Sequence, residues 1–170
     1  MRIALFGYAG VGKDYIVKYY FEKLGYTRLS FSDQLKIQAC QVFDWLEKDY
    51  PPELKEIPLN ITTTMGELIT KTPREIWLEF NLIRRIENNI FIRTLKDQLE
   101  YIQGDIVISD IRTQEEWNFA KEEGFMIIKI SSENSIHGLN DFDKQQDSFD
   151  FDFEYNNKMN GIEDFIEFMK

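Results

Sequence analysis

The chain has 170 residues, a length that suits one compact domain with a sizeable buried core. Hydrophobic residues make up 43% and aromatic residues 15%, so we do not expect disorder, and the net charge of −10 argues against sequence-independent nucleic-acid binding. No apolar run approaches the roughly 18–20 residues of a membrane span, and the N-terminus begins directly with a strand-like run. We therefore expect a soluble, cytoplasmic protein without a membrane or nucleic-acid partner. One cysteine, Cys40, and one histidine, His137, exclude an intramolecular disulfide and make a Cys/His zinc site improbable.

Short apolar runs alternate with helical patterns along the chain. Strands are expected at residues 2–6, 26–31, 105–109, 125–130 and 151–155, and helices at 13–24, 33–48, 73–87, 89–103, 114–123 and beyond 160. Ser32 or Asp33 would cap the second helix, and capping boxes are expected at 64–67, 72–75 and 113–116. Residues 131–150 are polar and acidic, which is typical of a mobile excursion. This alternation predicts an α/β fold, a three-layer α/β/α sandwich around a parallel five-stranded sheet, with ligands at the carboxyl ends of the strands.

A glycine-rich turn follows the first predicted strand. The residues Gly7-Tyr8-Ala9-Gly10-Val11-Gly12-Lys13 fit the pattern G-x-x-x-x-G-K and stand between a strand and a helix, as phosphate-binding loops do. Glycines let the backbone curl so that N–H groups and the helix N-terminus face an anion, and Lys13 would reach the β- and γ-phosphates. Asp14 stands where a serine or threonine usually ligates Mg²⁺, and a carboxylate can hold this ion as well. The alternative is a glycine turn with an incidental lysine.

Further charged residues stand where a phosphate or a metal ion would need them. Asp110 follows the most apolar strand, and an aspartate at such a strand end commonly helps to hold the metal in proteins with this loop. Arg112 would project from the same edge and could clamp a phosphate, although both residues could also be ordinary turn and surface residues. In an acidic protein, a cluster of charged residues after the second strand suggests capture of an anionic acceptor, or otherwise solvated helix faces: Asp33, Lys36, Arg74, Arg84 and Arg85. Trp77 and Phe80 could stack a base, but aromatic residues at this spacing are more often core residues.

Four segments, in order along nearly the whole chain, carry a resemblance to a known family. They are Gly7-Tyr8-Ala9-Gly10-Val11-Gly12-Lys13-Asp14; Ser30-Phe31-Ser32-Asp33-Gln34-Leu35-Lys36; Thr72-Pro73-Arg74-Glu75 followed by Arg85; and Ile108-Ser109-Asp110-Ile111-Arg112 followed by Glu115, with a weaker fifth segment at 152–157. Together they resemble the bacteriophage-type deoxynucleoside monophosphate kinases, relatives of the adenylate and dephospho-coenzyme A kinases. The resemblance implies a P-loop kinase fold and transfer of the γ-phosphoryl group of ATP to a (deoxy)nucleoside monophosphate, in the host cytoplasm if a phage encodes the chain.

The resemblance also implies a role for each matching residue. Residues 1–170 would form a single nucleotide-kinase domain, with an acceptor-binding insertion at about 33–103 and a lid-like segment at about 131–150; small nucleotides would be its partners, and it could form a homodimer. Lys13, Arg85 and Arg112 would be catalytic, and Asp14 and Asp110 would bind Mg²⁺. The cofactor ATP would contact Gly7, Gly10, Val11, Gly12, Lys13, Asp14 and Asn157. The acceptor would contact Asp33, Lys36, Arg74, Arg85, Arg112 and Glu115.

The chain also departs from the family pattern, and the run Leu78-Glu79-Phe80-Asn81-Leu82 stands where the family has L-Q-x-F-G-T. Two further departures lie near the phosphates. Tyr15 replaces the threonine that usually follows Gly-Lys-Asp, which removes a hydroxyl group near the metal. The lid-like segment contains only His137 and Lys144 among several aspartates, where the family usually brings arginines over the γ-phosphate. Two alternatives therefore remain beside the nucleotide kinase: a P-loop module that binds nucleotide with impaired catalysis, and a kinase for another small metabolite.

Overall fold

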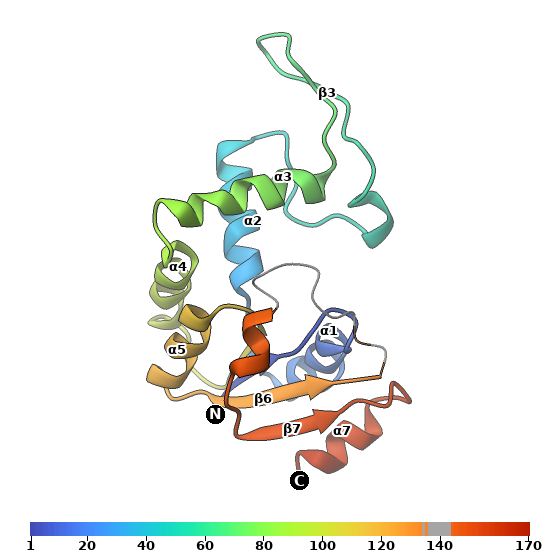
Figure 1. Cartoon of the computed structure of the whole chain (residues 1–170), viewed down its shortest axis with the longest axis vertical. Coiled ribbons are helices and arrows are strands. Elements are labelled where there is room, and N and C mark those ends of the chain that lie inside the picture. Colours follow the sequence, from blue (N-terminus) through green and yellow to red (C-terminus); the bar gives the residue numbers. More distant parts are fainter. Residues whose placement is uncertain (134, 136–143) are drawn as a thin grey trace. The chain divides into compact units, whose positions relative to one another are not determined.

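The computed structural model describes residues 1–133, 135 and 144–170. Five parallel strands form one sheet in the order β2-β5-β1-β6-β7, and β6 and β7 can be followed side by side in Figure 1. The strands are β1 (Arg2–Phe6), β2 (Thr27–Leu29), β5 (Ile106–Ile111), β6 (Met126–Ser131) and β7 (Phe153–Asn156). Helices flank this sheet, so the predicted α/β fold with a parallel five-stranded sheet and the three-layer arrangement of P-loop kinases is confirmed.

The central strands are apolar because both of their faces are covered. Side chains alternate between the faces of a strand, so Ile3 and Leu5 of β1 share one face, where they belong to a buried cluster with Phe21 and Phe165. Phe6 points to the other face, where its ring lies 5.7 Å from that of Phe149. The cluster on the first face is supplied by the helical segment after β1 and by α7 (Glu163–Phe168).

The helix predicted after the glycine-rich turn forms as one helical stretch of three geometries. It comprises α1 (Lys13–Ile16), a π-helical turn at Val17–Phe21 and a 3₁₀ turn at Glu22–Leu24. Gly25 ends it with φ of 84°, a left-handed conformation that favours glycine. α5 (Gln114–Glu122) begins at Thr113, where the predicted capping box is present with both of its hydrogen bonds.

The chain divides into two compact units, one formed by Met1–Phe31 with Leu95–Lys170 and the other by Ser32–Thr94. The second unit has its own buried cluster of Ala39, Leu46, Ile76 and Trp77. Its elements are most of α2 (Phe31–Val42), a 3₁₀ turn (Pro52–Leu54), β3 (Ile61–Thr62), β4 (Leu68–Ile69), α3 (Pro73–Phe80), a 3₁₀ segment (Asn81–Arg85) and the first half of α4 (Ile90–Leu99). Among the residues that the structure describes, no helix is both long enough and apolar enough to cross a membrane.

Several predicted boundaries in and near the second unit are wrong. The capping box expected at 64–67 is instead the turn of the antiparallel β3–β4 hairpin, because Gly66 takes a φ of 82° and the Thr63 hydroxyl accepts the Glu67 N–H group. The second helix begins at Phe31, one residue before the expected cap, because the Asp110 carboxylate accepts the Phe31 N–H group. It also ends at Val42 rather than near 48, and the helix expected to reach 87 changes to 3₁₀ geometry after Phe80.

Candidate functional site

The glycine-rich turn follows central strand β1 and adopts a conformation that its glycines alone allow. The φ angles of Gly7, Gly10 and Gly12 are 143°, 81° and 87°, all in the region that residues with a side chain rarely adopt. A Cβ atom on Gly7 would stand 2.1 Å from the Ile130 carbonyl oxygen, and one on Gly12 would stand 2.5 Å from Nδ2 of Asn157. Two of the three glycines are therefore required by close packing as well as by backbone angle.

The lysine of the turn folds back over the beginning of the loop. The Lys13 ammonium donates hydrogen bonds to the carbonyl oxygens of Gly7 and Tyr8, the latter at 2.9 Å. Asp14, in the first turn of α1, is exposed. The positive charge of Lys13 thus lies at the loop, where an anion bound to the N–H groups would meet it.

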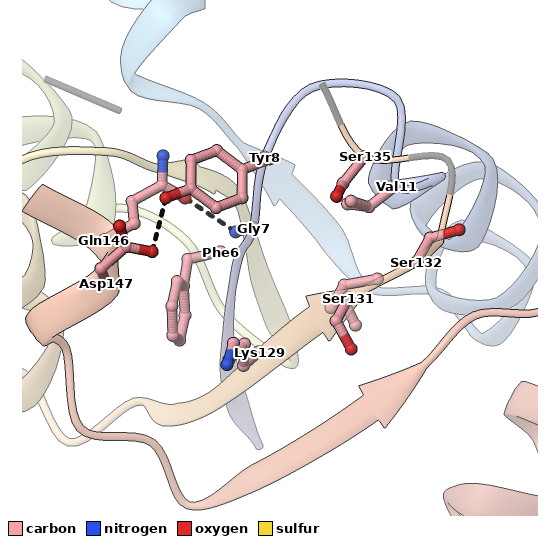
Figure 2. A pocket seen from close by; sticks show the side chains of 11 residues that line it. Phe6, Gly7, Tyr8, Val11, Lys129, Ser131, Ser132, Ser135, Gln146 and Asp147 are labelled. Carbon is pink, nitrogen blue, oxygen red and sulfur yellow. Dashed lines mark hydrogen bonds between the residues drawn. The ribbon is translucent and has the colours of Figure 1, made fainter. Parts of the chain in front are cut away.

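The first half of the loop is also held from the segment that follows β6. Oε1 of Gln146, in the 3₁₀ turn η5 (Gln146–Ser148), accepts the Gly7 N–H group at 3.0 Å. The Tyr8 hydroxyl donates to Oδ1 of Asp147 at 2.5 Å. Figure 2 shows both bonds as dashed lines from η5 to the loop. Two residues of the predicted lid-like segment, neither of them basic, therefore contact the loop.

The second half of the loop is held by the asparagine that follows β7. Nδ2 of Asn157 donates to the Val11 carbonyl oxygen at 2.9 Å, and Oδ1 accepts the Met159 N–H group at 3.0 Å. The backbone of Asn157 donates to the Ser131 carbonyl oxygen at 2.7 Å. Both ends of this side-chain amide are thus engaged by the protein itself.

A pocket of about 190 Å³ opens beside the loop at the carboxyl ends of β1 and β6. In Figure 2, Gln146, Asp147 and Tyr8 lie on one side of it, and Ser131, Ser132 and Ser135 lie on the other. Its remaining lining residues are Phe6, Gly7, Val11, Lys129 and Ile130. The pocket therefore combines an apolar floor with a rim of hydroxyl, amide and carboxylate groups beside the loop.

The end of β5 lies next to the loop, because β5 pairs with β1 and Ile111 stands opposite Phe6. Asp110 is 8% exposed, and its two carboxylate oxygens accept hydrogen bonds from the Ser30 hydroxyl and the Phe31 N–H group, both at 2.9 Å. These bonds attach β5 to Ser30, which follows β2, and to the first residue of α2.

Arg112 stands two residues beyond Asp110 and is fixed by its backbone. Its N–H group donates at 2.8 Å to Oε2 of Glu116, whose side chain is almost fully buried. The Arg112 side chain is exposed, and its guanidinium has no partner among the residues that the structure describes. The arginine thus has a fixed backbone and a guanidinium that can reach a ligand.

The basic residues predicted for an acceptor lie in the second unit. The Lys36 ammonium stands 3.6 Å from Oδ1 of Asp33 and 5.2 Å from the centre of the Trp77 ring. Arg74 is exposed and forms an ion pair with Glu56. Arg85 is exposed at the end of a 3₁₀ segment, with no partner for its guanidinium in the described part of the chain. The two arginines are thus exposed, whereas Lys36 and Asp33 are half-buried, and Trp77 belongs to the core of the unit.

The predicted site residues therefore fall into two groups, and their functional roles stay predictions. The first unit brings Lys13, Asp14, Asp110, Arg112, Glu115 and Asn157 to the carboxyl edge of the sheet or the helices that follow it, together with Gly7, Gly10, Val11 and Gly12. The second unit carries Asp33, Lys36, Arg74 and Arg85. Of the two basic residues expected in the lid-like segment, Lys144 is exposed, and His137 lies outside the described residues.

Sequence reasoning missed the residues that hold this edge together. Glu116 had a signal, since Thr113-x-x-Glu116 is a capping box, but nothing in the pattern showed that its carboxylate would also accept the Arg112 N–H group. Gln146 and Tyr8 had no signal, because their partners lie 139 residues away in the chain.

The residues of this edge fit a bound phosphate better than a metal cage built by protein alone. In the described ranges, no group of three or more His, Cys, Asp or Glu side chains comes together as a metal site. Mg²⁺ usually binds through one or two carboxylates together with substrate phosphates and water, so Asp14 and Asp110 stay predicted donors.

The chain is similar in sequence to a viral protein. No protein-family model matches the chain. A protein of Acanthamoeba polyphaga mimivirus, named "Putative deoxynucleotide monophosphate kinase", is 29% identical over 140 residues, which cover 75% of this chain and 72% of that protein. The similarity supports a nucleotide kinase in general, an enzyme class that uses ATP. It gives no support to a bacteriophage origin, and it leaves the particular reaction open.

Proposed function

We propose that the chain catalyses ATP-dependent phosphorylation of a (deoxy)nucleoside monophosphate to the diphosphate. The observation that carries this proposal is the loop at residues 7–13, whose three left-handed glycines follow the central strand and whose Lys13 ammonium lies at the loop. A loop of this kind at a helix N-terminus is suited to the phosphates of a nucleotide. The similarity to a mimivirus protein with a nucleotide kinase name supports the same class of reaction.

The residues of the first unit would serve the phosphate donor. The loop N–H groups and Lys13 would bind the β- and γ-phosphates, and Asp14 and Asp110 would hold the Mg²⁺ that neutralises them. Arg112 would reach the transferred phosphoryl group, because it directly follows β5, which pairs with the strand before the loop, and its guanidinium is exposed.

The residues of the second unit would serve the acceptor. Lys36, Arg74 and Arg85 would bind the monophosphate, with Asp33 fixing the Lys36 ammonium. Catalysis would then consist mainly of alignment and charge neutralisation, because phosphoryl transfer needs little covalent help from the protein.

The first test is to incubate the purified chain with ATP, Mg²⁺ and each of the common deoxynucleoside and ribonucleoside monophosphates, and to measure the diphosphates by chromatography. We expect diphosphate from at least one acceptor and none from the Lys13→Ala variant. Lys18→Ala is the matched control, since Lys18 is an exposed lysine of the same helical stretch whose ammonium lies over the Tyr19 ring. Equal turnover by wild type and Lys13→Ala would refute the assignment of the loop.

A second candidate is a nucleotide-binding module without transfer. Two observations favour it: Gln146 and Asp147 contact the loop from the segment in which the family places arginines, and Tyr15 is exposed and lies 4.5 Å from the Tyr19 ring rather than supplying a small hydroxyl group. This candidate predicts that the chain binds MgATP but yields no diphosphate with any monophosphate. A kinase of another small metabolite would instead phosphorylate an acceptor outside the nucleotide panel.

A further inference from the structure

Two buried side-chain amides hold the glycine-rich loop at its two ends. Gln146 and Asn157 are each only 4% exposed, although glutamine and asparagine are usually surface residues. Gln146 accepts the N–H group of Gly7, at the beginning of the loop, and Asn157 donates to the carbonyl oxygen of Val11, near its end. The loop between these two bonds contains the residues that would face a phosphate.

Neither amide is free to bind a ligand through these atoms without releasing the loop. Asn157 uses Nδ2 for Val11 and Oδ1 for the Met159 N–H group, and its backbone is bonded to Ser131. Its Nδ2 atom also occupies the space where a side chain on Gly12 would begin. The arrangement indicates a support beneath the loop rather than a group directed toward a base.

A loop rich in glycine needs such supports more than other loops do. Glycine has the largest backbone freedom of all residues, so an unsupported loop samples many conformations whose N–H groups do not converge. An anion that must first order this loop binds more weakly than one that meets a loop already ordered. A buried N–H or carbonyl group that loses its partner is costly, so each bond strongly favours the observed conformation.

We propose that Gln146 and Asn157 are positioning residues that hold the loop in its phosphate-binding conformation. The expected effect of these residues on nucleotide affinity rests on the function proposed above. Their expected effect on the conformation of the loop does not depend on that function. It also gives the segment that follows β6 a task that does not require arginine, because Gln146 acts on the loop backbone and not on a phosphate. Asn157 then acts through the loop instead of contacting ATP directly.

The test compares matched variants at neighbouring positions. Gln146→Met keeps the length of the side chain and removes the acceptor for Gly7; the control Gln145→Met removes a bond to the Gln114 N–H group of α5 instead. Asn157→Asp removes the donor for Val11, and the control Asn156→Asp adds the same charge at the exposed residue before it. The measurements are amide hydrogen exchange of the peptide that covers residues 6–14 and the dissociation constant for MgATP.

We expect the two loop variants to exchange the loop amides faster than wild type, while peptides of β5 stay protected. We also expect their dissociation constants for MgATP to rise about tenfold, with no such rise in the two controls. Gln146→Glu retains an acceptor oxygen and is expected to restore protection of Gly7, even though its added charge weakens ATP binding. If Asn157→Asp does not fold, the comparison of Gln146→Met, Gln146→Glu and Gln145→Met still tests whether the loop is held from η5.

Unchanged exchange of the loop in Gln146→Met would overturn the proposal, as would equal changes in Gln145→Met. Faster exchange in every peptide would also overturn it, because the residue would then support the whole unit and not the loop. If wild type binds no MgATP, the proposed function fails. The exchange of the loop peptide still decides whether the two amides position it.

Discussion

The carboxyl edge of the parallel sheet and the unit of residues 32–94 hold their polar groups in opposite ways. The sheet edge contains four buried polar residues, Asp110, Glu116, Gln146 and Asn157. Each forms a hydrogen bond with a backbone group of the loop, of a strand end or of a helix start. In the other unit, the arginines expected to bind an acceptor are exposed. The first region is thus ordered before any ligand arrives, while the second presents charges that can change partners.

The energies of the two kinds of contact explain this difference. A buried polar group that loses its partner costs about 1–3 kcal/mol, so the bonds at the sheet edge strongly favour one conformation. An exposed ion pair such as Arg74–Glu56 contributes about 0–1 kcal/mol, since water screens the charges. An arriving phosphate can therefore replace Glu56 as the partner of Arg74 at little cost to the fold.

The largest expected effect comes from the exposed arginines of both regions. We expect Arg112→Ala and Arg85→Ala each to reduce kcat/KM for diphosphate formation by on the order of 10²–10³, because Arg112 would lose a charge contact to the transferred group and Arg85 would lose one to the acceptor phosphate. Melting temperatures should hardly change, since neither guanidinium has a partner in the described part of the protein. Steady-state kinetics with the best acceptor measure the effect.

The control for these variants is Arg93→Ala. Arg93 is also exposed, but its guanidinium is bonded to the Glu87 carboxylate at 2.9 Å and 3.0 Å. These bonds hold the pKa of the Glu87 carboxyl group below its ordinary value. Unchanged turnover in Arg112→Ala would show that this residue has no part in the proposed reaction. If kcat/KM fell as much in Arg93→Ala, the loss of surface charge in general would explain the effect.

An intermediate effect is expected from two glycines at opposite ends of one helical stretch. Gly12 and Gly25 have nearly equal φ angles of 87° and 84°, so alanine should cost about 1–2 kcal/mol at either position through the backbone alone. A Cβ atom on Gly12 would in addition meet Nδ2 of Asn157 at 2.5 Å, whereas one on Gly25 would meet nothing within 4 Å. We expect Gly12→Ala to cost a further 1–3 kcal/mol, roughly, through overpacking.

Urea unfolding and MgATP titration of both variants measure this difference. Gly12→Ala should weaken MgATP binding because Asn157 must move away from the loop, and Gly25→Ala should leave the affinity of the folded protein unchanged. Equal losses of stability and of affinity in the two variants would mean that the loop is not tightly packed against Asn157.

The smallest effect comes from the two capping boxes, one in each region. Thr113 and Glu116 are 4% and 1% exposed, and the Glu116 carboxylate accepts the N–H groups of both Arg112 and Thr113. The box of Thr72 and Glu75 is more exposed. We expect Thr113→Ala to destabilise its helix by about 2 kcal/mol and Thr72→Ala by about 0.5–1 kcal/mol, because water can replace the lost bond only at the exposed box.

Hydrogen exchange of the α5 and α3 peptides measures the two losses separately, which global unfolding of a chain with two compact units does not do. Ser replacements at both positions keep the hydroxyl group and should restore most of the protection. A larger loss at Thr72 than at Thr113 would contradict the contrast between a buried and an exposed polar region.

The local pattern of the sequence was enough to predict the parallel sheet, the glycine-rich loop and the capping boxes at 72–75 and 113–116. Each of these depends on residues that are close in the chain: apolar runs such as 106–109, the spacing from Gly7 to Lys13, and a threonine three residues before a glutamate. The false capping box at 64–67 shows the limit of such patterns. There the same spacing of a threonine and a glutamate occurs in a hairpin turn, because β3 and β4 pair on either side of it.

The tertiary structure alone decided which polar groups hold the site in place. Asp110 caps a helix that begins 79 residues earlier, and Gln146 and Asn157 reach the loop across 139 and 146 residues. A hydrogen bond between distant residues leaves no periodic trace in the chain, since its partners meet only when the strands have paired. The sequence by itself determined the elements and the chemistry available at their ends, and burial determined which of those groups became supports and which stayed exposed to meet a ligand.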